Sequence, residues 1–292
     1  KGWAAAGKPP VPLVVGDSIG FGNNDNFNFS NGRGVRGYIN RGLDDGVSST
    51  RYAYANFAGP GEALANVAGT TDNWAIRRAV LAEVGFPFSS IIGNHGINSS
   101  GLAWPSPFQE QFDAATAFLR GMGSKPIVWL TPTRKTTQGG NSQWTDTANQ
   151  TAANGQLADL VAYLNGGTPP ANVSAVISME TYAADPVATT KWPVGSYAGV
   201  LGSSVIIGAT SLTLDVAPTP GDYLVLEPAD ANNERVYALS VTGSGPYTVT
   251  LASALTKAHA GGVAVKVALT EDGTHPTTGW CIGASAAIIA AK

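Results

Sequence analysis

The feature of this sequence that most constrains its fold is an alternation of short apolar runs with helical segments over its first two thirds. Each apolar run is bounded by turn residues, and the longer segments between the runs carry helix start and stop signals. Strands that alternate with helices form βαβ units, and such units build a mostly parallel sheet covered by helices. The sequence therefore predicts an α/β protein. The expected strands are residues 13–15, 52–57, 88–92, 127–130 and 173–178.

Helices are expected between these strands. One begins at Asp72, and its expected apolar face consists of Trp74, Ile76, Ala79, Val80 and Val84. The next helix starts with Pro107 in its first turn, where proline is favoured. A third helix is expected to end near Leu164, and a fourth is expected to cover Thr278 to Ala291. Residues 19–50 are rich in Gly and Asn and are predicted to be one long loop. Such a loop either forms the wall of a site or packs as an ordinary surface loop.

The pattern changes near residue 198. From there to about residue 268 there is no helix signal, and short alternating runs are separated by Gly- and Pro-rich turns. We therefore expect a small all-β module at residues 198–267, inserted into an α/β domain made of residues 1–197 and 268–292. The expected strands of the module are residues 211–214, 223–226, 235–241, 247–251 and 263–267.

Chemistry-bearing residues stand near both ends of the chain. The first strand is followed by Gly16-Asp17-Ser18, which places a hydroxyl where α/β sheets bind ligands. On its own this tripeptide is more typical of a turn. Near the other end, Asp272 and His275 are three residues apart, with Gly273 between them. Serine, histidine and an acid are the groups that acyl transfer through a serine nucleophile requires. The sequence thus predicts Ser18 as nucleophile, His275 as general base and Asp272 as the acid that orients it.

These two segments resemble the first and last blocks of the SGNH hydrolases, also called GDSL esterases. The blocks are Val15-Gly16-Asp17-Ser18 and Asp272-Gly273-Thr274-His275-Pro276, and the resemblance covers residues 11 to about 197 and 268–292. It implies a flavodoxin-like, three-layer α/β/α fold with a mostly parallel five-stranded sheet. It also implies an oxyanion hole that includes a glycine and an asparagine.

Two inner segments resemble the blocks that supply this oxyanion hole. The segment Asn56 to Glu62 resembles the glycine block, with Gly61 as the best match and Gly59 as the alternative. The segment Gly96-Ile97-Asn98-Ser99 resembles the asparagine block, with serine where the family has an aspartate. The resemblance therefore implies an oxyanion hole formed by Ser18, Gly61 and Asn98.

Other residues are weaker candidates for the site. His95 lies in the same turn as Asn98 and either contacts substrate or bonds to backbone, whereas His259 is expected at the surface because no acid is near it in sequence. Trp104, Trp144 and Trp192 fall in predicted loops, where they either stack on sugar rings or cover the core. The candidate substrate-binding residues are therefore His95, Trp104 and Trp144. The three histidines and the single Cys281 show no metal-ligand spacing, so neither metal nor cofactor is expected. Cys281 is expected in the core.

Composition excludes some partners. Only 13% of residues are charged and the net charge is −3, so the basic face that nucleic acid requires is missing. No apolar run is long enough to span a bilayer, and a membrane partner is not expected. No secretory signal is visible at the first residues, which look like the start of a cut or processed chain. Low charge with abundant Gly, Ser, Thr and Asn favours an extracellular or virion location. The β module loosely resembles modules of phage tail proteins, which suggests virion assembly or a homo-oligomer formed through it.

The function predicted from these features is a serine esterase that removes short acyl groups, acetyl first, from a carbohydrate or polysaccharide. A lipase or thioesterase on the same fold is an alternative, but it would need an apolar groove, and the predicted loops are polar. A non-catalytic glycan-binding or structural virion module is a second alternative. The presence of Ser18, Asp272 and His275 together argues against it.

Overall fold

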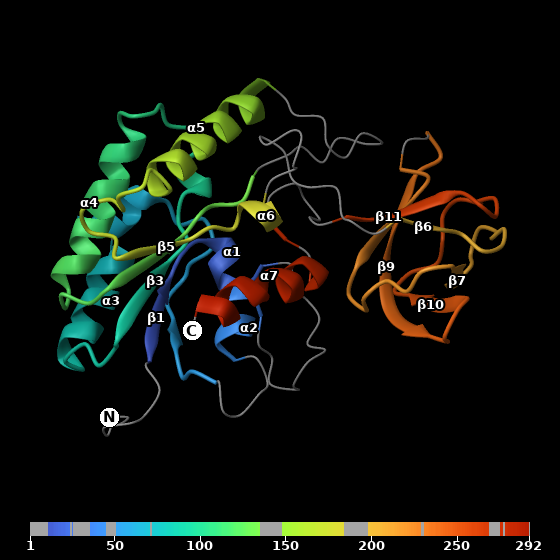
Figure 1. The fold of residues 1–292 in the computed structure, drawn as a ribbon, viewed down its shortest axis with the longest axis horizontal. Helices are drawn as coiled ribbons and strands as arrows, with labels where there is room; N and C mark the ends of the chain where they lie inside the picture. The colour runs from blue at the N-terminus through green and yellow to red at the C-terminus, as the bar shows by residue number, and fades with distance from the viewer. Residues whose placement is uncertain are drawn as a thin grey trace.

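The protein folds around two sheets, one parallel and one antiparallel (Figure 1). The computed structural model describes residues 11–23, 25, 36–44, 51–70, 72–134, 148–183, 198–228, 231–268, 275–276 and 278–291. Asp272, Trp144 and Trp192 lie outside the described residues, so their predicted roles stay predictions.

The first sheet has five strands in the order β2-β1-β3-β4-β5, and every neighbouring pair is parallel. Strand β1 is fully buried, and this explains why its sequence is a continuous apolar run rather than an alternating one. The α/β prediction is confirmed. The strands are β1 (Pro12–Val15), β2 (Ala55–Asn56), β3 (Ser90–Gly93), β4 (Ile127–Leu130) and β5 (Ala175–Ile177).

Helices cover both faces of this sheet, which makes three layers (Figure 1). One face carries α3 (Asp72–Glu83), α4 (Phe108–Gly121) and α5 (Ala148–Leu164), and the other carries α2 (Tyr38–Leu43) and α7 (Thr278–Ala291). On the first face Phe112 of α4 packs edge-on against Trp129 of β4, and on the second Tyr38 packs edge-on against Trp280. The short elements are α1 (Ser18–Phe21), the π-helical turn η1 (Asn66–Thr70), the 3₁₀ turn η2 (Ile97–Ser99) and α6 (Glu180–Ala183).

The prediction of one long loop at residues 19–50 is wrong, because α1 extends into this range and α2 lies within it. The glycines that suggested a loop have another purpose here. A Cβ atom on Gly42 would lie 2.3 Å from Cβ of Ile288, so this glycine lets α2 pack closely on α7. A helix of six residues is too short to show a clear helical period in sequence.

The predicted apolar face of α3 is also wrong in part. Trp74 is fully buried, but Ile76, Val80 and Val84 are 63%, 47% and 45% exposed. The helix instead turns Trp74, Arg77 and Leu81 inward, at intervals of three and four residues. Arg77 belongs to this face because it pairs with a carboxylate, Glu62, on a neighbouring loop.

The second sheet has six strands in the order β6-β11-β8-β9-β10-β7, and all of its neighbours are antiparallel. Its two outer strands are bonded to each other at one end, since Leu201 pairs with Leu214 and the Gly202 N–H donates to the Thr213 carbonyl (2.7 Å). The sheet thus closes around an apolar core of its own. It matches the β module of the predicted fold class. The strands are β6 (Ala198–Val200), β7 (Ser211–Leu214), β8 (Tyr223–Leu226), β9 (Glu234–Thr242), β10 (Tyr247–Leu251) and β11 (Ala264–Ala268).

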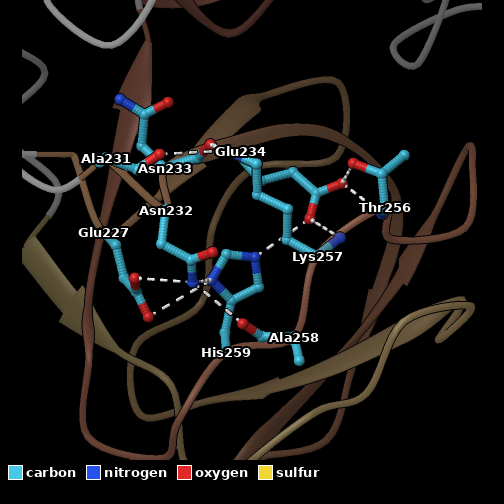
Figure 2. Close-up of polar contacts among 9 residues, drawn as sticks. All are labelled: Glu227, Ala231, Asn232, Asn233, Glu234, Thr256, Lys257, Ala258 and His259. Atoms are coloured by element: carbon cyan, nitrogen blue, oxygen red, sulfur yellow. Dashed lines mark hydrogen bonds and ion pairs between the residues drawn. The ribbon is translucent and has the colours of Figure 1, made fainter.

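His259 is buried in this module, which contradicts its predicted surface position (Figure 2). Its Nε2 lies 3.0 Å from Glu234 Oε2 and its Nδ1 lies 3.4 Å from Glu227 Oε1. Glu234 also accepts hydrogen bonds from Thr256 and from the Lys257 N–H. Burial alone would raise the pKa of Glu234, but these donors outweigh burial and lower it. The prediction failed because both acids are distant in sequence and are brought close only by strand pairing.

Candidate active site

The topology of the parallel sheet brings three separate segments to one edge. Ser18 follows β1, Gly61 follows β2 and Asn98 follows β3, and these three strands are neighbours in the order β2-β1-β3. Because parallel strands end at the same edge of a sheet, the segments after them meet there. Hydrogen bonds join the segments directly, since the Gly59 N–H donates to the Gly16 carbonyl (2.8 Å) and the Asn94 N–H to the Val15 carbonyl (3.3 Å).

Ser18 is the first residue of α1 and is 4% exposed. The preceding Asp17 caps this helix, with its side chain accepting the Ile19 N–H at 2.9 Å. Gly16 is required for close packing, because a Cβ atom there would lie 1.8 Å from Asn94 Oδ1. Burial raises the pKa of Asp17, and the nearby His95 offsets this only in part. The Gly-Asp-Ser segment thus combines the end of a strand, a helix cap and the start of the short helix that carries the hydroxyl.

His275 is the residue that approaches the serine hydroxyl. Its Nε2 lies 2.7 Å from Ser18 Oγ, although the two residues are 257 positions apart in the sequence. A general base must be within hydrogen-bond reach of the proton that it removes, and this distance meets that requirement. His275 is half-buried and Ser18 is buried.

The segment Gly59-Pro60-Gly61-Glu62 forms a tight turn beside Ser18. The Glu62 N–H donates to the Gly59 carbonyl (3.1 Å), and Gly61 has a φ of +77°, the arrangement of a type II turn with Pro and Gly at its two central positions. The Gly59 N–H is already bonded to Gly16. Among the described residues, no hydrogen-bond acceptor is assigned to the Gly61 N–H. This N–H therefore can donate to a substrate oxygen, which favours Gly61 over Gly59 as the oxyanion-hole glycine.

Asn98 lies on the turn after β3 and has an exposed side chain. One N–H of its amide donates to the Glu62 carbonyl (3.1 Å), which fixes the orientation of the amide and leaves its second N–H for a ligand. The neighbouring Ser99, which replaces the aspartate of the family pattern, accepts the Leu64 N–H with its hydroxyl (3.0 Å). This bond also connects the turn after β3 to the segment after β2.

Two residues that we predicted to contact substrate have other contacts. His95 is fully buried, and its Nε2 lies 2.7 Å from Glu62 Oε1. Trp104 packs edge-on against Phe108 (5.7 Å between ring centroids) and Tyr163 (5.5 Å). Both side chains are thus held by other residues of the α/β domain. A substrate contact by either of them stays a prediction.

Glu62 and Arg77 are residues of this region that we did not predict. The Glu62 carboxylate contacts both His95 and Arg77. Burial would raise its pKa, but the hydrogen bond and charge of His95 and the charge of Arg77 outweigh burial and lower it. The only sequence signal was the position of Glu62 directly after Gly61, and nothing marked Arg77 within its helix.

A cavity of about 340 Å³ opens beside Gly61. Glu62, Asn66 and Arg77 give its wall a polar character, and it is lined by Gly59, Pro60, Gly61, Glu62, Asn66, Trp74 and Arg77. A second cavity of similar size lies between the sheet and α7 and is mostly apolar. None of Ser18, Gly61, Asn98 or His275 lines this second cavity.

Within the described part of the chain, no three His, Cys, Asp or Glu side chains are grouped so that they could hold a metal ion. The described helices include none with the length and apolar character needed to cross a membrane. Cys281 is fully buried in α7, as expected, and burial raises the pKa of its thiol.

No protein-family model matches this sequence. No curated protein matches it either. Among solved structures, the chain is similar to a G-D-S-L family protein from Desulfitobacterium hafniense, described as lipolytic, with 15% identity and a TM-score of 0.40 over 62% of this chain and 83% of the other. It is also similar to a carbohydrate acetylesterase from Xanthomonas citri, with 11% identity and a TM-score of 0.37 over 88% and 78% of the two chains.

A third similar structure is a carbohydrate acetylesterase from Sinorhizobium meliloti, with 10% identity and a TM-score of 0.38 over 62% and 89% of the two chains. The chain thus resembles GDSL-type lipolytic proteins and carbohydrate acetylesterases. Because all three TM-scores are below 0.5, the chemistry of this chain rests on its own residues.

Proposed function

We propose that this protein is a serine esterase of the SGNH type, and that it removes short acyl groups, acetyl in particular, from a carbohydrate. The observation that carries the proposal is the 2.7 Å contact between His275 Nε2 and Ser18 Oγ at the carboxyl end of β1. A hydroxyl and an imidazole in contact, beside unbonded donors, are what acyl transfer requires.

The proposed reaction has two steps. Ser18 Oγ attacks the ester carbonyl carbon while His275 Nε2 accepts the hydroxyl proton, and the same imidazole then returns the proton to the leaving alcohol. Water, activated by His275, next attacks the acyl-serine, which releases the carboxylic acid and restores the hydroxyl. Asp272 has the proposed role of holding the imidazole in the correct orientation.

The negative charge that develops on the carbonyl oxygen is stabilised by three proposed donors: the Ser18 N–H, the Gly61 N–H and the Asn98 side-chain amide. Asn98 is oriented by the Glu62 carbonyl, so it needs little rearrangement during the reaction. Loss of one such donor typically costs about 3–4 kcal/mol of transition-state stabilisation.

The polar cavity beside Gly61 supports a polar substrate. Its volume of about 340 Å³ exceeds what an acetyl group needs, and its wall includes a carboxylate, an amide and a guanidinium. Such groups suit the hydroxyl groups of a sugar better than an alkyl chain. Among the described residues of the proposed site, Gly61 alone lines the polar cavity, whereas none lines the apolar cavity under α7.

The test combines active-site labelling with substrate comparison. A serine-reactive phosphonate should label Ser18, and Ser18→Ala should abolish both labelling and hydrolysis of an aryl acetate. Aryl-ester hydrolysis should fall steeply from acetate to longer acyl chains, and acetate should be released from at least one acetylated polysaccharide. Preference for octanoate with no release from any glycan would indicate a lipase. An unlabelled Ser18 with no turnover would indicate a binding module.

We further propose that residues 198–267 are a separable module that shapes the substrate entrance or mediates assembly. The motivation is that its last strand ends at Ala268, shortly before His275 in the sequence. Replacing the module by a short linker should leave a folded α/β domain, as measured by circular dichroism and a cooperative unfolding transition. An extracellular or virion location stays a prediction of the same kind.

A further inference from the structure

We propose that Glu62 is a positioning residue of the oxyanion hole, which holds the Gly61 turn and the Asn98 turn in one fixed arrangement. This inference rests on the proposed esterase function. Glu62 is the last residue of the Gly61 turn, and it contacts the turn that carries Asn98 twice, once through its backbone and once through its side chain.

The backbone contact is direct. The Glu62 carbonyl accepts a hydrogen bond from Asn98 Nδ2 at 3.1 Å, and Glu62 is bonded covalently to Gly61. The two proposed donors from β2 and β3 are thus separated by one residue and one hydrogen bond. A displacement of the Glu62 backbone would therefore shift the acceptor of the Asn98 amide together with the end of the Gly61 turn.

The side-chain contact fixes this peptide group. Glu62 Oε1 lies 2.7 Å from Nε2 of His95, which is fully buried and belongs to the same turn as Asn98. The imidazole is itself held against Trp129 of β4, with 6.1 Å between ring centroids. Glu62 therefore connects the turn after β2 to the core of the sheet as well as to the turn after β3.

Arg77 supplies a second, independent anchor. Its guanidinium pairs with Glu62 Oε2 and lies over the ring of the buried Trp74, 5.1 Å from the ring centroid. The Glu62 carboxylate is thus bonded from two sides, by a residue of the β3 turn and by a residue of α3. Because only 8% of Glu62 is exposed, these contacts are little screened by solvent.

The expected effect on catalysis follows from distance. A donor that is displaced by about 1 Å from the transition-state oxygen can cost roughly 100-fold in rate. Glu62→Gln keeps the size of the side chain but removes the charge that holds Arg77 and His95. We expect this variant to lower kcat by roughly 10- to 100-fold with KM within about twofold, since the displaced donors act in the transition state.

A control with the same local chemistry exists in the β module. Glu234 is also 8% exposed and also bonds a buried histidine, His259, at 3.0 Å. Glu234→Gln therefore repeats the chemical change far along the chain from the proposed oxyanion hole. It should lower stability while kcat and KM stay at the wild-type values.

A readout specific for the oxyanion hole separates positioning from a general structural effect. The rates for an aryl acetate and for the matching thionoester, in which sulfur replaces the carbonyl oxygen, are compared for each variant. N–H donors bind sulfur more weakly than oxygen, so an intact hole should strongly prefer the oxygen ester. We expect Glu62→Gln to lower this preference by roughly 10-fold, in line with its effect on kcat, and Glu234→Gln to leave it unchanged.

Two further variants keep the test decisive if Glu62→Gln folds poorly. Arg77→Gln removes one anchor and leaves the Glu62–His95 contact, so it should lower kcat and the oxygen preference in the same direction but less. Arg77→Lys keeps the charge and should restore part of both.

A folded Glu62→Gln or Arg77→Gln with unchanged kcat and unchanged preference would overturn the inference. A raised KM with unchanged kcat would also overturn it, since Glu62 would then contact substrate in the polar cavity. A wild-type protein that is inactive and unlabelled by phosphonate would instead refute the proposed function itself.

Discussion

Alanine substitutions at Gly61 and Gly85 can separate a catalytic role of Gly61 from the effect of backbone strain on stability. Gly61 has a φ of +77° and Gly85 has a φ of +70°, and a Cβ atom on either would meet nothing within 4 Å in the described structure. An L-residue in this left-handed region costs about 1–2 kcal/mol. Gly61→Ala and Gly85→Ala should therefore lower the free energy of unfolding by similar amounts.

Only one of the two substitutions should affect catalysis. Gly61 lines the polar cavity and follows β2, whereas Gly85 lies between α3 and β3, before the strand rather than after it. We expect the methyl group that Gly61→Ala introduces to obstruct the close approach of a substrate to the Gly61 N–H. We expect kcat/KM for an aryl acetate to fall by about 100-fold or more in Gly61→Ala, the effect of losing one oxyanion donor, and to stay near wild type in Gly85→Ala.

The assay pairs steady-state kinetics with denaturant unfolding of both variants. Equal losses of stability with unequal losses of activity would support the assignment of Gly61. If Gly61→Ala retained wild-type kcat/KM, the Gly61 N–H would not be an oxyanion donor. If both variants lost activity in proportion to stability, the effect would belong to the fold and not to the site.

Other predictions concern titratable groups and the base. Burial raises the pKa of Asp222 to about 6 from 3.8, so the wild type should lose stability as pH rises from about 4 to about 6. In urea unfolding, Asp222→Asn should be more stable than the wild type by up to about 3 kcal/mol at pH 7, and it should show no such gain at pH 4. Because the pKa of Glu234 is lowered, the loss of stability in Glu234→Gln should be complete above pH 4.5 and should shrink as pH falls below it, in the same assay. His275→Ala should abolish aryl acetate hydrolysis with little change in melting temperature, whereas His259→Ala should keep activity while destabilising the β module. Activity that survives in His275→Ala would mean that another group is the base.

Local sequence signals predicted the strands of this protein well. β4 begins and ends at the predicted residues, and α7 does the same, because both are long enough or apolar enough to carry a clear pattern. In the β module, alternating runs bounded by turn residues predicted β7, β8 and β10 at their observed bounds. What was not predicted was strand β6 and the short helices α1, α2 and α6. In α1 and α2 the glycines serve close packing rather than loop formation.

The candidate site was predictable only where short segments carry a chemical pattern or resemble a known family. Ser18 and His275 could be proposed from the chemistry of acyl transfer, and Gly61 and Asn98 from their resemblance to the SGNH hydrolase blocks. The structure brings Ser18 and His275 into contact. The contacts of Glu62 with His95 and Arg77 could not be predicted, because they join a loop, a turn and a helix that become neighbours only in the folded chain. The same limit explains His259, whose acidic partners are brought to it by strand pairing.

The pairing of β6 with β11 has a consequence for how His275 reaches Ser18. Ala198 pairs with Lys266, so the chain enters and leaves the β module at adjacent points. The folded module therefore spans little distance between its ends, although it contains most of the residues between α6 and His275. If the module unfolded alone, the segment that closes the Ser18–His275 contact would become a long flexible loop. Each doubling of loop length costs only about 0.6 kcal/mol in closure entropy. The imidazole should consequently remain on the serine hydroxyl when the module melts, and esterase activity should outlast the first of two unfolding transitions.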